Sequence, residues 1–142
     1  MNDVAAAAVE ERLHADCWTD DGEKVALVAS RCDGCGTHYL PHALTCVECG
    51  GQSFRPRELV TPGTLYTYSI VRNAGGVWPD TYAVGYVDFP EGVRVFGQIR
   101  ETAPELLRIG APVNVERAVL YRRRDGTQVT CFRFRVSEGG RA

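Results

Sequence analysis

The chain has 142 residues, of which 44% are hydrophobic and 24% are charged. This length predicts one domain, alone or with a small appendage, and it permits a sizeable hydrophobic core. The 16 basic and 18 acidic residues leave a formal net charge of −2, which argues against a protein that coats nucleic acid or anionic membranes. The sequence contains neither an apolar run long enough to span a membrane nor a basic, secretory-type N-terminus, so we expect a soluble, cytoplasmic protein without membrane contact.

Residues 1–29 are rich in alanine and in charged side chains. Val4–Ala15 predicts one helix of about three turns, with Asn2 or Asp3 available as the N-cap. The charge is uneven along the chain: residues 1–31 carry seven acidic against three basic side chains, whereas residues 117–142 carry seven arginines against two acidic side chains. We therefore expect an acidic, helical segment at the N-terminus and a basic C-terminal region.

The next segment, residues 30–57, contains four of the six cysteines, arranged as two Cys-x2-Cys-Gly motifs. Two thiolates three residues apart can bind one metal ion if the chain turns sharply between them, and the following glycine permits that turn. Two such knuckles supply four thiolates in a tetrahedral arrangement, which is a closed structural zinc site. We predict a rubredoxin-like zinc ribbon over residues 30–57, whose ligands are Cys32, Cys35, Cys46 and Cys49.

Other interpretations of these cysteines are iron bound by the same four thiolates, redox disulfides and ordinary core cysteines. The disulfide is disfavoured because thiols stay reduced in the cytosol. His38 and His42 lie inside the ribbon and could replace a cysteine ligand, but a surface or hydrogen-bonding role is the better interpretation. Cys17 and Cys131 lie outside the motif and are better read as small buried hydrophobic residues than as reactive thiols.

Residues 58–142 have the alternation and turn residues of β-strands. Asp125-Gly126 predicts a tight turn between the last two strands, and Ala103–Ile109 predicts a short helix between the third and fourth. Five strands with a helix in that position predict an OB-fold barrel, although turn spacing alone would also allow an SH3-like barrel or half a sandwich. The predicted strands are Gly63–Val71, Tyr82–Asp88, Val93–Ile99, Val113–Leu120 and Gln128–Val136.

The sequence contains no nucleophile elbow, phosphate-binding glycine loop or zinc-peptidase helix, so we predict no catalytic residues. On an OB-fold, ligands usually contact the loops after the first and fourth strands. Here an exposed tryptophan beside glycines could stack on a base or cover a ligand, and a run of three arginines could hold phosphates. An ordinary packed tryptophan and a solvated hairpin tip would explain the same residues. The candidate ligand-binding residues are Arg72, Trp78, Tyr82, Arg122, Arg123 and Arg124.

Several segments together carry a resemblance to a known family, which extends from about residue 10 to residue 136. The knuckles are followed by this strand order and by characteristic short segments. The chain resembles the zinc-ribbon plus OB-fold family catalogued as domain of unknown function 35. The segments that carry the resemblance are Leu27–Gly36, Tyr39–Pro41, Cys46–Gly50, Gly63–Tyr68, Arg108–Val113 and Phe132–Phe134.

The resemblance implies a non-catalytic accessory subunit of a thiolase-superfamily enzyme that acts on acyl-coenzyme A thioesters. The partner would supply the nucleophile and the acid and base groups for thiolytic, retro-aldol or acyl-transfer chemistry. The small subunit would stabilise the partner in a hetero-oligomer and could help to bind the coenzyme A thioester. No family motif for coenzyme A contacts matches this chain residue by residue, so the six candidate ligand-binding residues depend on barrel geometry alone.

Two other functions remain open at this point. One is an OB-fold module that binds nucleic acid, which the net charge of −2 and the scarcity of clustered aromatic residues disfavour. The other is a rubredoxin-like electron carrier. The acidic N-terminal segment could either dock against the partner or fray.

Overall fold

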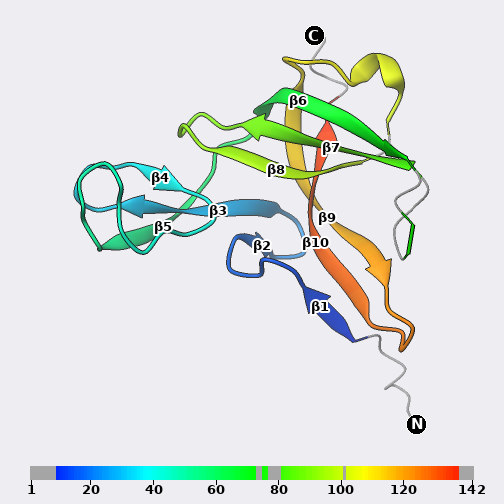
Figure 1. The fold of residues 1–142 in the computed structure, drawn as a ribbon, viewed down its shortest axis with the longest axis horizontal. Coiled ribbons are helices and arrows are strands. Elements are labelled where there is room, and N and C mark those ends of the chain that lie inside the picture. The colour runs from blue at the N-terminus through cyan, green and yellow to red at the C-terminus, as the bar shows by residue number, and fades with distance from the viewer. Residues whose placement is uncertain (1–8, 73–74, 77–80, 101, 138–142) are drawn as a thin grey trace.

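A computed structural model of the chain describes residues 9–72, 75–76, 81–100 and 102–137. These residues form a six-stranded sheet that curls into a barrel and a four-stranded sheet beside it (Figure 1). A single 3-10 turn, η2 (Pro104–Leu106), is the helical element assigned in this part of the chain. Over the same residues, no helix has the length and apolar character needed to cross a bilayer.

The barrel consists of five strands, and all five lie within two residues of their predicted bounds. β8 pairs with β7 on one side and runs parallel to β10 on the other, β10 pairs with β9, and β9 returns to β6, so the sheet closes on itself. This strand order confirms the predicted OB-fold barrel. The strands are β6 (Gly63–Arg72), β7 (Thr81–Asp88), β8 (Arg94–Ile99), β9 (Pro112–Arg122) and β10 (Gln128–Val136).

The hydrophobic core lies inside the barrel and continues beyond it. Inward positions of β6, β7 and β8 place Leu65, Val87 and Val95 in one buried cluster, as expected for strands with alternating side chains. Trp18 and Leu27, from the N-terminal third of the chain, belong to the same cluster. The barrel and the segment that precedes it therefore share one core.

The predicted helix over Ala103–Ile109 is shortened to η2. Its backbone bonds run from the N–H of Leu106 to the carbonyl of Ala103 and from Leu107 to Pro104, which is 3-10 spacing. No residue of η2 is fully buried, so little tertiary packing is available to lengthen a helix of this size.

The prediction of an N-terminal helix over Val4–Ala15 is wrong for the residues that the structure describes; residues 4–8 lie outside them. β1 (Glu10–Arg12) runs parallel to the first residues of β10, and the N–H of Leu13 donates to the carbonyl of Thr130 at 2.8 Å. The backbone of this segment therefore satisfies its hydrogen bonds on the edge of β10 that β8 leaves uncovered. This tertiary pairing outweighs the local helix preference of an alanine-rich sequence.

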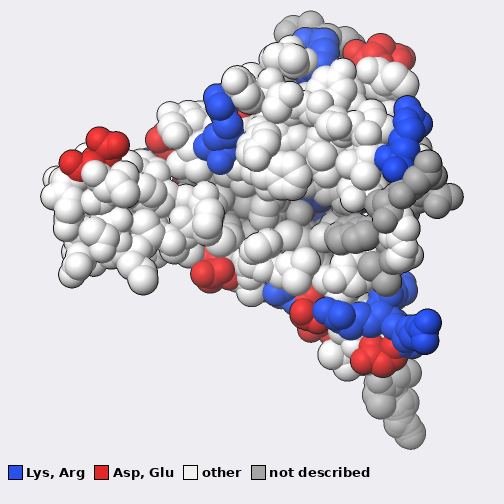
Figure 2. Space-filling model, viewed as in Figure 1, with Lys and Arg blue, Asp and Glu red and all other residues white. Residues whose placement is uncertain are grey.

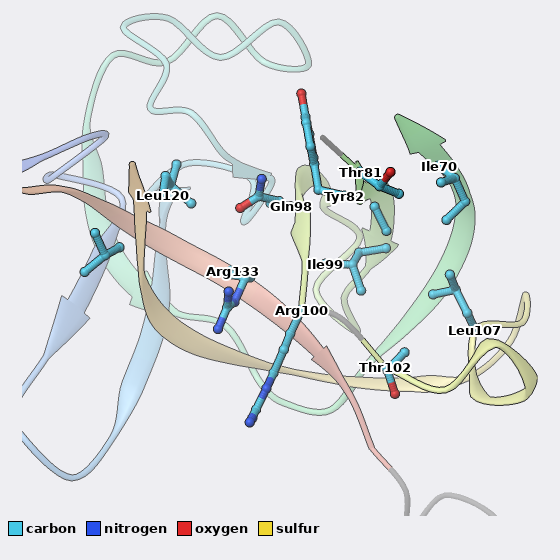
Figure 3. Close-up of a pocket in the computed structure, with 12 residues that line it drawn as sticks. Ile70, Thr81, Tyr82, Gln98, Ile99, Arg100, Thr102, Leu107, Leu120 and Arg133 are labelled. Carbon is cyan, nitrogen blue, oxygen red and sulfur yellow. The ribbon is translucent and has the colours of Figure 1, made fainter. Parts of the chain in front are cut away.

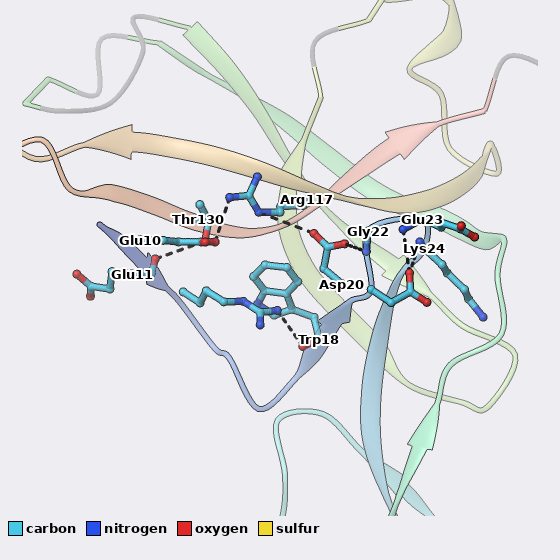
Figure 4. Close-up of polar contacts among 11 residues, drawn as sticks. Glu10, Glu11, Trp18, Asp20, Gly22, Glu23, Lys24, Arg117 and Thr130 are labelled. Carbon is cyan, nitrogen blue, oxygen red and sulfur yellow. Dashed lines mark hydrogen bonds and ion pairs between the residues drawn. The ribbon is translucent and has the colours of Figure 1, made fainter. Parts of the chain in front are cut away.

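Side chains fix β1 in this position (Figure 4). The Glu10 carboxylate accepts a hydrogen bond from the Thr130 hydroxyl at 2.6 Å and lies 3.1 Å from the Arg117 guanidinium. Glu11 pairs with Arg123 at 2.8 Å. The acidic N-terminal and basic C-terminal regions thus pair with each other within one chain. The described part of the acidic segment is therefore docked on β9 and β10 and needs no second protein to hold it.

The second sheet is built around β3 (Val25–Cys32), which pairs with β2 (Trp18–Asp20), β4 (His38–Tyr39) and β5 (Phe54–Glu58). The first half of β3 contributes Leu27 to the shared core, and its last residue is the first cysteine of the knuckles. One strand therefore connects the barrel core directly to the cysteine cluster.

Candidate metal centre and ligand surfaces

The four cysteines of the knuckles converge on one point. Their sulfur atoms all lie within 4.8 Å of one another, and none forms a disulfide. The Sγ atoms of Cys32 and Cys49 are 3.6 Å apart, and those of Cys35 and Cys46 are 3.5 Å apart. A tetrahedral zinc ion with Zn–S bonds near 2.3 Å separates its sulfur ligands by about 3.8 Å. The donor set and its spacing therefore fit a tetrahedral thiolate-bound metal.

The two knuckles share one backbone geometry. The N–H of Gly36 donates to the carbonyl of Cys32 at 2.9 Å, and the N–H of Gly50 donates to that of Cys46 at 2.8 Å. Both glycines have a positive φ near +80°, which side-chain-bearing residues rarely adopt. The glycine after each second cysteine is required by this turn, as the motif predicts.

Glycines also leave room around the sulfur atoms. A Cβ atom built on Gly34 or on Gly51 would lie 3.3 Å from the Sγ of Cys49. Larger residues at either position would press on the sulfur atoms of Cys32 and Cys49. The two glycines thus keep their side of these sulfur atoms free of side chains, which agrees with a metal ion bound by the four thiolates.

The hydroxyl of Tyr39 supports the cluster, a role that the sequence analysis did not assign. It accepts a hydrogen bond from the N–H of Val47 at 3.0 Å and lies 3.3 Å from the Sγ of Cys46, to which it donates. This bond is the largest of several hydrogen bonds, including those from the backbone N–H groups of Cys49 and Glu48, that together lower the pKa of Cys46 to about 6. For Cys49, the N–H of Gly51 favours the thiolate, but the neighbouring thiols raise its pKa to about 12. Four crowded thiolates need a cation, because the second charge is costly beside the first.

Among the histidines of the ribbon, His42 has the predicted hydrogen-bonding role, whereas the Nε2 of His38 is buried without a hydrogen-bond partner among the described residues. The Nε2–H of His42 donates to the carbonyl of Asp16 at 2.8 Å, and His38 is not among the groups that converge on the knuckles. Cys17 and Cys131 are buried, and burial raises the pKa of each thiol to about 11. Neither thiol is therefore activated as a nucleophile.

The described members of the predicted ligand-binding set lie in two places: Arg72 and Tyr82 at the paired ends of β6 and β7, where Arg72 is opposite Thr81, and the three arginines at the β9–β10 hairpin. Arg72 is exposed at the end of β6, and Trp78 lies outside the described residues. The three consecutive arginines lie at the tip of the β9–β10 hairpin, where Figure 2 shows basic side chains next to acidic ones. Arg123 is engaged by Glu11, which raises the pKa of its guanidinium. Arg122 and Arg124 are exposed beside it.

Tyr82 lines a cavity of about 380 Å³ on the barrel (Figure 3). Two arginines that the sequence analysis did not single out also line it: Arg133 lies 2.6 Å from the carboxylate of Glu116, and Arg100 lies 3.3 Å from the same carboxylate. The arginines come from β10 and from the end of β8, so sequence spacing gives no sign of their proximity. The other described lining residues are Ile70, Thr81, Ala83, Gln98, Ile99, Thr102, Leu107, Val119 and Leu120.

An aromatic surface formed by Tyr66, Tyr86 and Phe96 lies on the outward face of β6, β7 and β8. Tyr86 and Phe96 are cross-strand partners that are 42% and 54% exposed, with ring centroids 5.2 Å apart. The Arg94 guanidinium lies 3.4 Å above the ring of the exposed Tyr66 and is held by Asp88. Alternation along the predicted strands could have identified these outward aromatic side chains. Clustered exposed aromatic residues are typical of protein-binding surfaces.

Comparisons with known proteins agree with this architecture. Residues 21–55 match the family described as ChsH2, rubredoxin-like zinc ribbon domain, and residues 57–117 match ChsH2, C-terminal OB-fold domain. Benzoylsuccinyl-CoA thiolase subunit BbsA of Thauera aromatica is 33% identical over 117 residues, which cover 81% of this chain and 79% of BbsA. A DUF35 domain-containing scaffold protein of Methanocaldococcus jannaschii is 31% identical over 108 residues, covering 74% of this chain and 77% of that protein.

A solved structure has the same arrangement of ribbon and barrel. The structure titled Ltp2-ChsH2(DUF35) aldolase superposes with a TM-score of 0.65 at 26% identity, covering 78% of this chain and 84% of that chain. The motifs, the fold and these similarities agree along most of the sequence. The chain therefore belongs to the DUF35 family, in which a rubredoxin-like zinc ribbon precedes an OB-fold domain of the ChsH2 type.

Proposed function

We propose that this chain is a non-catalytic accessory subunit of a thiolase-superfamily enzyme that acts on acyl-coenzyme A thioesters in the cytoplasm. The observation that carries the proposal is the similarity to a thiolase subunit over four fifths of the chain, including both knuckles and most of the barrel. A structural relative whose title names an aldolase supports the same class of partner. The partner would supply the nucleophile and the acid and base groups.

In this proposal the cysteine cluster holds one structural zinc ion. Cys32, Cys35, Cys46 and Cys49 are the ligands, and four thiolates leave no coordination position for a substrate. When bound, zinc supplies folding free energy to a ribbon that is too short to build an adequate core by itself. The Tyr39 hydroxyl orients Cys46 and stabilises its thiolate.

The aromatic surface of Tyr66, Tyr86 and Phe96 is the proposed contact for the partner protein. Three large, partly exposed rings on one sheet face offer apolar area, and the Arg94–Asp88 pair beside them adds polar contacts. Burial of such rings dominates the energetics of many protein interfaces. Stabilisation of the partner would follow from covering this surface.

The coenzyme A thioester would be shared between the two subunits. The proposed contacts are Trp78 and Tyr82 together with Arg72 and Arg122–Arg124, whose guanidinium groups suit phosphate. Arg100 and Arg133 line the cavity beside Tyr82, but both lie within ion-pair distance of Glu116, so they are not included. Because Arg123 is already paired with Glu11, we expect Arg122 and Arg124 to contribute more than Arg123.

The test is reconstitution of the carbon–carbon bond-forming or bond-cleaving activity from separately purified subunits. We expect activity only when the partner retains its own nucleophile, and we expect this chain to raise the partner's thermal stability. Activity of this chain alone on acyl-coenzyme A thioesters would overturn the non-catalytic role. No change in the partner on mixing would overturn the accessory role.

The alternative function, nucleic-acid binding by the OB-fold, is not favoured. The net charge is −2, and the hairpin arginines lie among acidic side chains, one of which neutralises Arg123. Binding to single strands would be strongly salt-dependent if it used these arginines. Absence of such binding at low salt would remove this alternative.

A further inference from the structure

A second group of metal-ligating side chains lies where the N-terminal segment meets the ribbon. One ligand atom each from Asp16, Cys17 and His42 lies within 4.8 Å of the other two. Asp16 and Cys17 follow β1 in the turn that leads to β2, and His42 belongs to the loop after β4. Residues 26 positions apart in the chain are thus brought together on the side of the ribbon that contacts the barrel.

The spacing within this group resembles that of the four-cysteine cluster. The Sγ of Cys17 lies 3.6 Å from Oδ1 of Asp16, just as the paired sulfur atoms of the ribbon lie 3.5 and 3.6 Å apart. Tetrahedral zinc, with Zn–S near 2.3 Å and Zn–O near 2.0 Å, separates sulfur and oxygen ligands by about 3.5 Å. The hydrogen-bonded thiol and carboxylate are therefore already at ligand spacing.

A hydrogen bond holds the ring of His42 next to Asp16. Its Nε2–H donates to the backbone carbonyl of Asp16 at 2.8 Å, which fixes the tautomer and leaves the lone pair on Nδ1. Metal-bound histidines commonly donate their other ring N–H to a carbonyl or carboxylate in this way. Because the carbonyl belongs to Asp16, the same contact keeps the imidazole next to the carboxylate.

The group has both an entrance and an open side. Asp16 and His42 are exposed, so an ion can reach them from solvent. Cys17 is buried but lines a groove of about 370 Å³, together with His14, Leu40 and aromatic residues of the barrel. Three protein ligands leave the fourth tetrahedral position to water or to a group that enters this groove.

We propose that Asp16, Cys17 and His42 form a second divalent transition-metal site, with Zn²⁺ as the expected ion, separate from the four-cysteine site of the ribbon. Thiolate, imidazole and carboxylate together are a ligand set of the zinc type. On binding, the thiol proton of Cys17 passes to the solvent and the sulfur–metal bond forms. The ion ties the N-terminal segment to the ribbon loop through bonds from both.

The test is zinc titration of the full-length, untagged chain with its ribbon site filled. We expect the wild type to take up a second equivalent of Zn²⁺, and the double variant D16N/H42Q to bind it at least tenfold more weakly while keeping the first. Both substituted side chains are exposed, so the fold should survive. The matched control is E23Q, which removes an exposed acidic group of the same segment outside the cluster and should leave both equivalents in place.

Cobalt provides a second readout that reports on the thiolate itself. With zinc retained in the ribbon, Co²⁺ added to the wild type should produce a sulfur-to-cobalt charge-transfer absorption, and C17S should lose it. Failure of the wild type to bind a second equivalent would overturn the proposal. Retention of that equivalent by D16N/H42Q, or an unchanged absorption in C17S, would assign the ion elsewhere and overturn it equally. None of these outcomes depends on whether the chain has a thiolase-like partner.

Discussion

The hydroxyl group of Tyr39 supports the second cysteine knuckle. Tyr39 follows the first knuckle in sequence but binds the second, where it accepts from the N–H of Val47 and donates to the Sγ of Cys46. Hydrogen bonds of this kind orient metal ligands and favour their charged form. A single side chain therefore couples the geometry of the cluster to the protonation of one ligand.

We predict that Y39F weakens zinc binding about 10- to 100-fold without unfolding the ribbon. The ring still packs edge-on against Phe54 at 6.0 Å, and only the hydroxyl is lost. Competition with a chelator would measure the affinity, and circular dichroism would monitor the fold. Unchanged affinity would show that the hydroxyl does not support the cluster.

Replacement of a ligand should have a larger effect. We predict that C32S or C46S binds one zinc fewer per chain and loses the ribbon fold, because the knuckles have no alternative core. Any partner activity should fall through lost assembly. Elemental analysis and size-exclusion chromatography would measure both effects. C131A is the control: it removes a buried thiol of the barrel and should leave the zinc content unchanged. An intact complex of C46S with full activity would contradict the structural role.

Among the secondary-structure elements, the docking of β1 on β10 depends on the carboxylate of Glu10, which solvent partly screens. The hydrogen bond from Thr130, followed by the contacts of Arg117, lowers the pKa of Glu10 below its ordinary value of 4.5. A carboxyl group with a depressed pKa in the folded state stabilises that state above its unfolded pKa. This contribution is lost as the pH falls through the folded value.

We therefore predict that docking of β1 is complete at neutral pH and weakens below about pH 4.5. E10Q should cost about 1 kcal/mol at pH 7, a small value because solvent partly screens the pair. This cost should shrink as the pH falls through the lowered pKa of Glu10 and the native carboxylate takes up its proton. Hydrogen exchange of the Leu13 amide, which bonds to β10, would follow the segment. E11Q is the control, since the exposed pair of Glu11 and Arg123 should contribute under about 0.5 kcal/mol. Equal effects of the two variants would argue against the role of Thr130.

The outward face of β7 and β8 supplies another prediction. Y86S/F96S should reduce association with the partner at least tenfold, because two exposed rings that would be buried in an interface are removed. Quantitative pull-down of the partner would measure it. I109S is a suitable control, since Ile109 is an exposed apolar residue of the barrel outside this face. Undiminished association of Y86S/F96S would place the interface elsewhere.

At the scale of the whole molecule, local sequence patterns could predict what depends on neighbours in the chain. Alternating β-branched and aromatic residues predict the five barrel strands, and the two Cys-x2-Cys-Gly motifs predict the cluster at which their sulfur atoms meet. In both cases the prediction depends on the spacing of residues that are close together in the sequence.

The features that could not be predicted depend on residues far apart in the chain. The helix expected over Val4–Ala15 is wrong because this segment instead binds β10, where Glu10 accepts a hydrogen bond from Thr130. The two residues are 120 positions apart, so no local pattern indicates their contact. Arg100 and Arg133 come together at the cavity from two strands that pair in parallel. Each of these contacts requires the closed barrel, which no local propensity encodes.

Purification of the full-length chain from its native cells at natural expression, with mass spectrometry of the intact assembly, would test directly whether it works as a subunit of a thiolase-like complex. We expect a thiolase-superfamily protein in near-equal amount. Recovery of the chain alone, or with nucleic acid in place of such a protein, would contradict this role.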